Sequence, residues 1–99
     1  ILATFDSSPT SPAFDYDDIK YIRITNLDDT NSIIITKATD ATSAAEEVRA
    51  GGSIYMINGA KDVIGAASKA NQTSLAELDT LYAYSASGAI DLEVVIATA

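Results

Sequence analysis

The stretch Asp18-Ile-Lys-Tyr-Ile-Arg-Ile-Thr-Asn-Leu-Asp-Asp-Thr-Asn-Ser-Ile-Ile-Ile-Thr36 carries the clearest folding signal of the chain. Ile22 and Ile24 alternate with polar and aromatic residues, and this period of two is typical of a β-strand. Asp28–Asn31 is rich in residues that bond their own backbone in turns. Ile33–Ile35 is a β-branched triplet, which suits a strand buried on both sides. The stretch therefore predicts two strands that fold back on each other as a hairpin around Asp28–Asn31.

Glycine-containing segments mark the next breaks in the chain. Gly51-Gly52 is predicted to bend or bulge a strand pair made of Val48–Ala50 and Ser53–Ile57. Asn58-Gly59 is a strong signal for a hairpin turn, and it predicts a short following strand at Val63-Ile64. This part of the chain is therefore read as a succession of short antiparallel strands.

Two segments also fit a helical turn. Ser43-x-x-Glu46 and Ser74-x-x-Glu77 both match a capping box. The first falls at the end of Thr39–Ala45, which is small and polar and is read as a loop; one helical turn is possible there, but Gly51-Gly52 follows too soon for it to run far, and we prefer the strand pair broken at these glycines. For the second, leucines at helical spacing compete with an alternating strand pattern. We predict a short helical turn at 74–78 and a strand at 80–85, with a longer helix over 74–84 as the alternative.

The end of the chain alternates without ambiguity. In Ile90–Ile96 the apolar residues are expected to face the core while Asp91 and Glu93 face water. Six to eight such short strands, separated by turn signals, predict an all-β fold: a small antiparallel β-sandwich or barrel of the jelly-roll or immunoglobulin-like type.

The domain organisation follows from the composition of the N-terminal residues. Residues 15–99 are predicted to form a single β-sandwich domain, and residues 1–14 an N-terminal arm or linker. Two prolines and small polar residues in Asp6–Pro12 oppose regular structure. Ile1–Phe5 has two readings, a short leading strand or an arm that pairs with a neighbouring molecule.

The composition argues against most enzymes. The 99-residue chain has no cysteine and no histidine, which removes thiolate metal sites, the commonest general base and the commonest zinc ligand. Its serines have no histidine to activate them and no Gly-x-Ser-x-Gly motif. We predict no catalytic residues and no cofactor. The net charge of −8 disfavours nucleic-acid binding, and no apolar run approaches the roughly 20 residues that a membrane span needs.

Oxygen-bearing side chains gather in or near the predicted loops. They are Asp15, Asp17, Asp18, Asp28, Asp29, Asn31 and Asp40. Loops of this kind can bind Ca²⁺, which takes several oxygen ligands, but none has the residue order of an EF-hand. Turn formation is the preferred reading, and we predict no metal site.

The candidate functional residues are apolar and aromatic. Tyr21, Tyr82 and Tyr84 fall by parity on the side opposite the aliphatic residues, where they either pack across strands or form a protein contact face. The N-terminal residues Ile1, Leu2, Phe5 and Phe14 are apolar groups that need covering. These seven residues are the predicted protein–protein contacts, and apolar groups on both faces of a small sheet favour assembly into a homo-oligomer.

Four segments resemble small β-sandwich virion proteins of tailed bacteriophages. They are Ile22-Arg-Ile-Thr-Asn-Leu-Asp-Asp-Thr-Asn31, Arg49-Ala-Gly-Gly-Ser-Ile-Tyr-Met-Ile57, Leu81-Tyr-Ala-Tyr-Ser and Ile90-Asp-Leu-Glu-Val-Val-Ile96. The resemblance extends over residues 19–97 and rests on strand and turn patterns rather than on a chemical motif. It implies a structural role and transfers no residue-specific function.

The resemblance leads to a functional expectation. The protein is expected to be a non-enzymatic cement or decoration protein on the capsid surface of a virion, with the major capsid protein or other virion proteins as partners. A tail or neck component is the alternative within the same class. A stand-alone carbohydrate- or cell-surface-binding module is the alternative from a different class.

Overall fold

The computed structural model describes residues 1–6, 13–15, 17–40, 42–57 and 77–98, and all regular structure in these ranges is β-strand. None of the described segments is a helix able to span a membrane. The strands are β1 (Ala3–Asp6), β2 (Phe14–Asp15), β3 (Ile19–Asn26), β4 (Ile33–Ala38), β5 (Ser43–Val48), β6 (Ser53–Met56), β7 (Thr80–Tyr84) and β8 (Leu92–Thr98).

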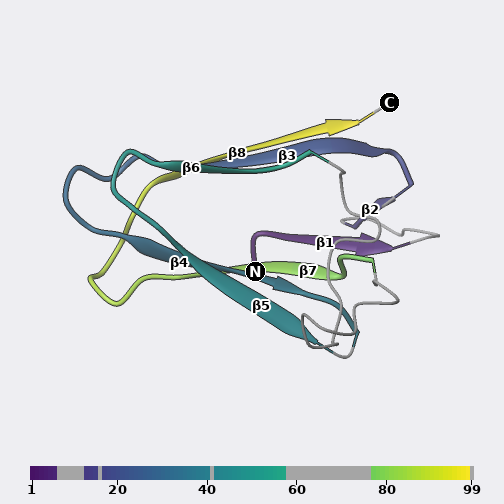
Figure 1. The fold of residues 1–99 in the computed structure, drawn as a ribbon, viewed down its shortest axis with the longest axis horizontal. Coiled ribbons are helices and arrows are strands. Elements are labelled where there is room, and N and C mark those ends of the chain that lie inside the picture. Colours follow the sequence, from purple (N-terminus) through teal and green to yellow (C-terminus); the bar gives the residue numbers. More distant parts are fainter. Residues whose placement is uncertain (7–12, 16, 41, 58–76, 99) are drawn as a thin grey trace, which may run out of the picture.

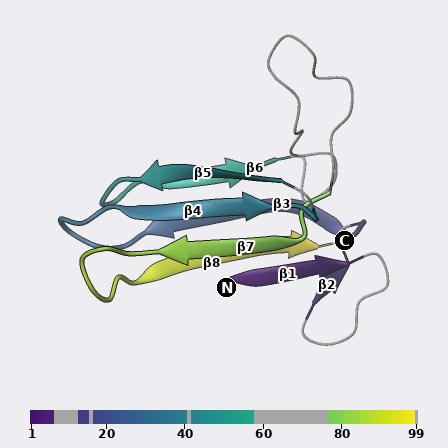
Figure 2. The ribbon, with the colours of Figure 1, turned by 90° about the horizontal axis from the view of Figure 1, so that it is seen from below.

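The strands form two sheets that face each other. The larger sheet has the order β2-β1-β7-β4-β5 and the smaller has the order β6-β3-β8. Figure 1 shows the smaller sheet above the larger one, and Figure 2 shows the two layers from below. The described strands pair antiparallel except β1 with β2, which are parallel. The predicted all-β class is confirmed, with the two-layer arrangement of a small β-sandwich.

The predicted hairpin around Asp28–Asn31 is wrong. β3 pairs with β6 and β8, whereas β4 pairs with β5 and β7, so the two strands lie in different sheets. The segment between them crosses from one layer to the other (Figure 1). The same turn residues serve a hairpin or a crossing, because they reverse the chain without determining which strand lies beside it.

The hairpin in this region joins β4 and β5. Its turn is closed by the Thr39 N–H, which donates to the Thr42 carbonyl at 2.8 Å. β5 begins at Ser43, so the loop predicted over Thr39–Ala45 is wrong for Ser43–Ala45, and no helical turn forms at Ser43–Glu46. The chain breaks at Gly51-Gly52 as predicted, but of the predicted strand Val48–Ala50 only Val48 is in a strand, and β5 and β6 on either side of the glycines belong to different sheets. Gly51 has a φ of 76°, a left-handed conformation that glycine adopts readily.

The strand predicted at 80–85 is confirmed, whereas the helical turn predicted at 74–78 is wrong at 77–78, the part of it that the structure describes. β7 occupies 80–84 as a strand, and residues 77–79 before it are not helical, so the longer helix over 74–84 is wrong. The Asn58-Gly59 hairpin, the Val63-Ile64 strand and residues 74–76 of the predicted helical turn lie outside the described residues. β8 begins at Leu92, two residues later than expected.

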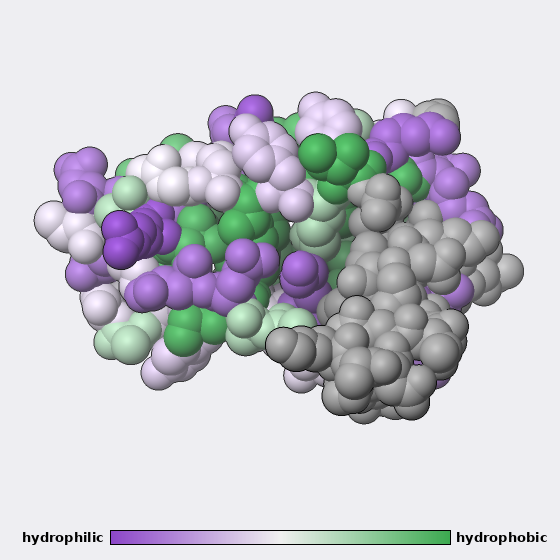
Figure 3. Space-filling view, in the orientation of Figure 1, coloured by the Kyte–Doolittle hydropathy of each residue, from purple (hydrophilic) through white to green (hydrophobic). Residues whose placement is uncertain are grey.

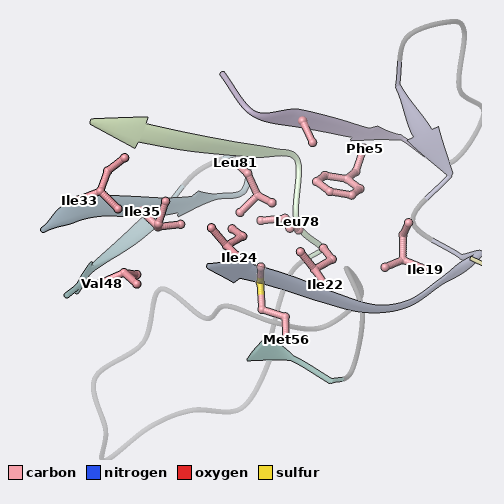
Figure 4. Packing of buried hydrophobic residues seen from close by; sticks show 11 residues of the cluster. Phe5, Ile19, Ile22, Ile24, Ile33, Ile35, Val48, Met56, Leu78 and Leu81 are labelled. Atoms are coloured by element: carbon pink, nitrogen blue, oxygen red, sulfur yellow. The ribbon is translucent and has the colours of Figure 1, made fainter. Parts of the chain in front are cut away.

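The core lies between the two sheets, where alternate residues of facing strands meet (Figure 4). Ile22 and Ile24 of β3 are completely buried. Ile19 is buried as well, although its parity is opposite, because a bulge between Ile19 and Tyr21 shifts the register of β3 against β8. In Figure 3 hydrophobic residues are visible between the two layers, bordered by hydrophilic ones.

The N-terminal residues contribute to this core. Ala3–Asp6 form β1, which pairs with β7 in the larger sheet, and Phe5 is only 3% exposed. The leading-strand reading of Ile1–Phe5 is therefore the one observed. An outward-reaching arm over the whole of residues 1–14 does not fit this placement, while residues 7–12 lie outside the described ranges.

A buried asparagine links the crossings between the sheets. The Asn26 side chain is fully buried, and its Nδ2 donates to the carbonyls of Asn31 at 2.9 Å and Val48 at 3.1 Å. Its Oδ1 accepts the N–H of Asp28 at 2.9 Å. The end of β3, the segment leading to β4 and the end of β5 are thus held by one amide group.

Replacing Asn26 by alanine is expected to lower the free energy of unfolding by about 3 kcal/mol or more, because two carbonyls and one N–H lose their partner. Asn26→Asp is the matched control, since it keeps the shape but sets a carboxylate against two carbonyls. We expect it to be at least as destabilising at neutral pH. Urea unfolding would measure both, and wild-type stability of Asn26→Asp would contradict the donor role.

Candidate functional site

The outer side of the larger sheet carries three large exposed apolar groups. Ile34 of β4 lies directly opposite Tyr84 of β7, and Tyr82 lies opposite Thr36 in the next outward-facing row. Ile34, Tyr82 and Tyr84 are 40%, 42% and 62% exposed. We call Ile34, Thr36, Ala45, Tyr82 and Tyr84 the aromatic face.

The local sequence explains how this face arises. β7 alternates Leu81 and Ala83 toward the core with Tyr82 and Tyr84 toward solvent. In β4, Ile35 is fully buried while Ile34 points outward. The prediction that Ile33–Ile35 is buried on both sides is therefore wrong for Ile34, because nothing among the described residues covers that side of the sheet.

The outer side of the smaller sheet is more polar. Arg23 of β3 lies opposite Val95 and donates from Nη2 to the Glu93 carboxylate at 2.7 Å. The hydroxyls of Thr25 and Ser53 are 2.7 Å apart across β3 and β6. The Arg23 Nε is buried without a partner among the residues described.

Tyrosines border these polar contacts. Tyr21 and Tyr55 are 40% and 61% exposed. Tyr55 lies directly opposite Arg23, and Tyr21 lies opposite Ala97. This side therefore offers separate aromatic groups around a polar centre, in contrast to the side-by-side groups of the aromatic face.

The predicted contact residues fall into separate places. Tyr82 and Tyr84 lie together, but Tyr21 is on the opposite side of the sandwich, so the three tyrosines do not form one surface. The outward orientation that parity predicted is confirmed for all three, because each is at least 40% exposed. Parity assigns a side chain to one side of its own strand, and it cannot assign two strands to the same sheet.

The four N-terminal candidates also differ in where they lie and in how far they are exposed. Phe5 is a core residue, so its side chain is not free to contact a partner, whereas Leu2 is partly buried against the core. Phe14 is 37% exposed, and its ring centroid is 5.9 Å from that of Phe5. Ile1 is 80% exposed.

Sequence reasoning missed two surface residues. Ile34 was assigned to the core because it sits inside an apolar triplet, and only the strand order reveals its exposure. Tyr55 is exposed opposite Arg23, and its alternation with Ile54 and Met56 was the signal that could have identified it.

Asp28 acts as a turn-forming residue. Its Oδ2 accepts the N–H of Asn31 at 2.7 Å and of Thr30 at 3.0 Å. The bond from Asn31 has the largest effect and that from Thr30 the next. Together they hold the pKa of Asp28 below its ordinary value, although some desolvation acts in the opposite direction. Among the described residues, no three acidic side chains gather in a way that could hold a metal ion.

No protein-family model, no curated protein and no solved structure matches the chain.

The lowered pKa of Asp28 gives a pH dependence with a definite sign. Because the folded-state pKa lies below the unfolded value, the carboxylate stabilises the fold above about pH 4 and loses this effect as the pH falls further. Asp28→Asn keeps an accepting oxygen but no charge. Wild type should therefore lose more stability than Asp28→Asn between neutral and acidic pH, and parallel losses in thermal melts would contradict the assignment.

Proposed function

We propose that the protein is a non-enzymatic structural protein that binds an assembled protein shell through its aromatic face. The observation that carries the proposal is the placement of Ile34, Tyr82 and Tyr84 side by side on a sheet surface that no described segment covers. Together with the resemblance to small virion β-sandwiches, this supports a cement or decoration protein on the capsid surface of a tailed bacteriophage.

The chemistry of the face suits a protein partner. Tyrosine combines a rigid apolar ring with a hydroxyl and is enriched at protein interfaces. The neighbouring Thr36 and Ala45 are small, so the tyrosine rings of β7 and the Ile34 side chain are the bulky apolar groups of this surface; Glu47 borders it opposite Ile34, and its carboxylate accepts the Ser32 hydroxyl at 2.6 Å. The net charge of −8 adds a preference for a partner surface that is neutral or basic.

A second contact on the other side of the sandwich fits a bridging role. Tyr21 and Tyr55 project from the smaller sheet, on the side away from Tyr82 and Tyr84. A small domain with contact groups on both outer surfaces can touch two subunits at once, which is what stabilising a shell requires. The subunits of the shell, including the major capsid protein, are the proposed partners.

The copy number in purified particles tests the proposal. Mass spectrometry of virions should find this chain at a number comparable to the major shell protein. A much lower number would favour a tail or neck component instead. Absence from particles, combined with glycan binding by the purified chain, would overturn the proposal in favour of a carbohydrate- or cell-surface-binding module.

Substitution of the aromatic face separates binding from folding. Tyr84→Ser and Ile34→Ser are expected to weaken binding to particles at least about tenfold, because central aromatic and apolar contacts dominate interface energies. Each should change the free energy of unfolding by less than about 1 kcal/mol, since only a cross-strand surface contact is lost.

Leu27→Ser is the matched control for this experiment. Leu27 is also apolar and 54% exposed, but it lies at the crossing after β3 and not on the aromatic face. Co-sedimentation of each purified variant with particles lacking the protein measures the binding. Wild-type binding by Tyr84→Ser, or an equal loss with Leu27→Ser, would count against this face.

A further inference from the structure

The edge strands of the two described sheets differ in how they are protected against pairing. Proteins commonly guard an edge by making it short or by placing charges on it. β2 and β6 are short, at two and four residues. β5 has six residues and carries Glu46 and Glu47. β8 has seven residues, no proline and a single charged group, Glu93, which already pairs with Arg23.

The contrast between β5 and β8 is sharpest on their inner sides. Glu46 lies opposite the buried Ile35, so a charged residue of β5 points toward the core side, where Lys37 approaches it at 3.7 Å. Such an inward charge discourages a further strand. The corresponding residues of β8 are Leu92, Val94 and Ile96, which lie opposite Asn26, Ile24 and Ile22.

No described strand pairs with the outward donors and acceptors of the β8 backbone. The Leu27 N–H bonds the Asp91 carbonyl, while the Asn26 N–H bonds the Gly52 carbonyl on the other side of β3. Because bonding directions alternate along an antiparallel strand, Glu93, Val95 and Ala97 direct their peptide groups toward β3. Those of Leu92, Val94 and Ile96 point to the open edge, where no other described strand lies.

The side chains at this edge are incompletely covered. Val94 is 36% exposed although it faces the inner side directly opposite Ile24, which is completely buried. Leu92 and Ile96 are also only partly buried against the core. One added strand would supply both the missing hydrogen-bond partners and the missing apolar cover.

The shape of the sandwich determines what kind of strand fits. Figure 2 shows β8 running behind β7, while β1 and β2 extend the larger sheet past the free edge of β8. A second copy pairing edge to edge would bring its own β1 and β2 into this overhang. A single extended segment brings no second sheet with it, so it fits beside β8.

The charges at the edge indicate the composition of that segment. Asp91 and Glu93 lie at the start of β8, and the Leu27–Asp91 backbone bond brings Asp28 and Asp29 close by. Of the two bases that β3 places beside β8, Arg23 is engaged by Glu93, and Lys20 lies at the other end, next to the residues that pair with Ala97 and Thr98. We propose that the free edge of β8 accepts an extended segment of another protein in which apolar residues alternate with lysine or arginine.

This site is separate from the aromatic face and does not depend on the function proposed above. It uses main-chain groups of the smaller sheet, whereas the aromatic face uses side chains on the outer side of the larger one. Loss of particle binding in Tyr84→Ser would therefore leave strand addition at β8 unchanged.

Hydrogen exchange of the whole chain tests the proposal directly. The probe is a capped peptide of about nine residues with alternating valine and lysine, a length that suits one strand. The amides of Leu92, Val94 and Ile96 should exchange fast in the free protein, and those of Glu93, Val95 and Ala97 slowly. The peptide should slow the first set at least about tenfold, by giving these amides a partner.

Several results would overturn the proposal. Protection of Leu92, Val94 and Ile96 in the dilute free protein would mean that the chain already covers this edge. Protection that grows with protein concentration alone would identify a second copy as the occupant. Equal protection by a valine–glutamate peptide would contradict the proposed preference for a basic segment. If the valine–lysine peptide has no effect, the edge of β8 does not bind an added strand.

Proline substitution adds a test based on strand parity. Val94→Pro removes an N–H that faces the open edge, so it should keep the fold and weaken peptide binding at least about tenfold. Val95→Pro removes a bond to β3 and should instead lower the melting temperature. If Val94→Pro does not fold, Val94→Lys repels the basic peptide from a partly exposed position and serves the same purpose. Unchanged binding by a folded Val94 variant would contradict the proposal.

Discussion

The buried amide of Asn26 is the interaction on which the connection of the two sheets depends. It bonds the chain on its way from β3 to β4 and the end of β5, while the Asn26 main chain bonds Gly51 and Gly52 before β6. The next residue, Leu27, bonds Asp91 before β8. Three crossings between the layers therefore meet at one end of the sandwich. A buried polar group is tolerated in this position because its hydrogen bonds to water are replaced by hydrogen bonds to the protein backbone.

Several of the strands were predictable from local patterns, but their partners were not, and the first half of β5 was read as a loop. Alternation identified β3 and β8, and β-branched residues identified β4, because side-chain direction is a property of each strand. Pairing depends on residues far apart in the chain, and the segment after Asn26 suits a hairpin or a crossing equally well. The deciding residue, Asn26 with its inward amide, is of the same turn-forming type as the partly buried Asp28 and Asn31 beside it.

The candidate contact residues show the same difference between what local patterns predict and what strand pairing determines. Parity correctly turned Tyr21, Tyr82 and Tyr84 outward, yet the sheet order places Tyr21 on the far side of the molecule. Phe5 was read as part of an arm because a proline-rich segment follows it, but its burial makes it a structural residue. Ile34 shows the opposite error, since an apolar side chain in an apolar triplet remains exposed when its strand has a covered side and an open side.

The distribution of partners along the chain has a consequence for synthesis on the ribosome. β3 is complete at residue 26, but both of its neighbours follow much later, β6 at 53–56 and β8 at 92–98. The inner side of β3, with Ile22 and Ile24, therefore emerges long before the strands that flank it. Because long-range pairing is slow, the smaller sheet can close only after residue 98 has left the exit tunnel. Until β6 emerges the nascent chain presents an unpaired apolar strand, and until β8 emerges one edge of β3 stays unpaired, a kind of edge that makes folding intermediates prone to aggregate.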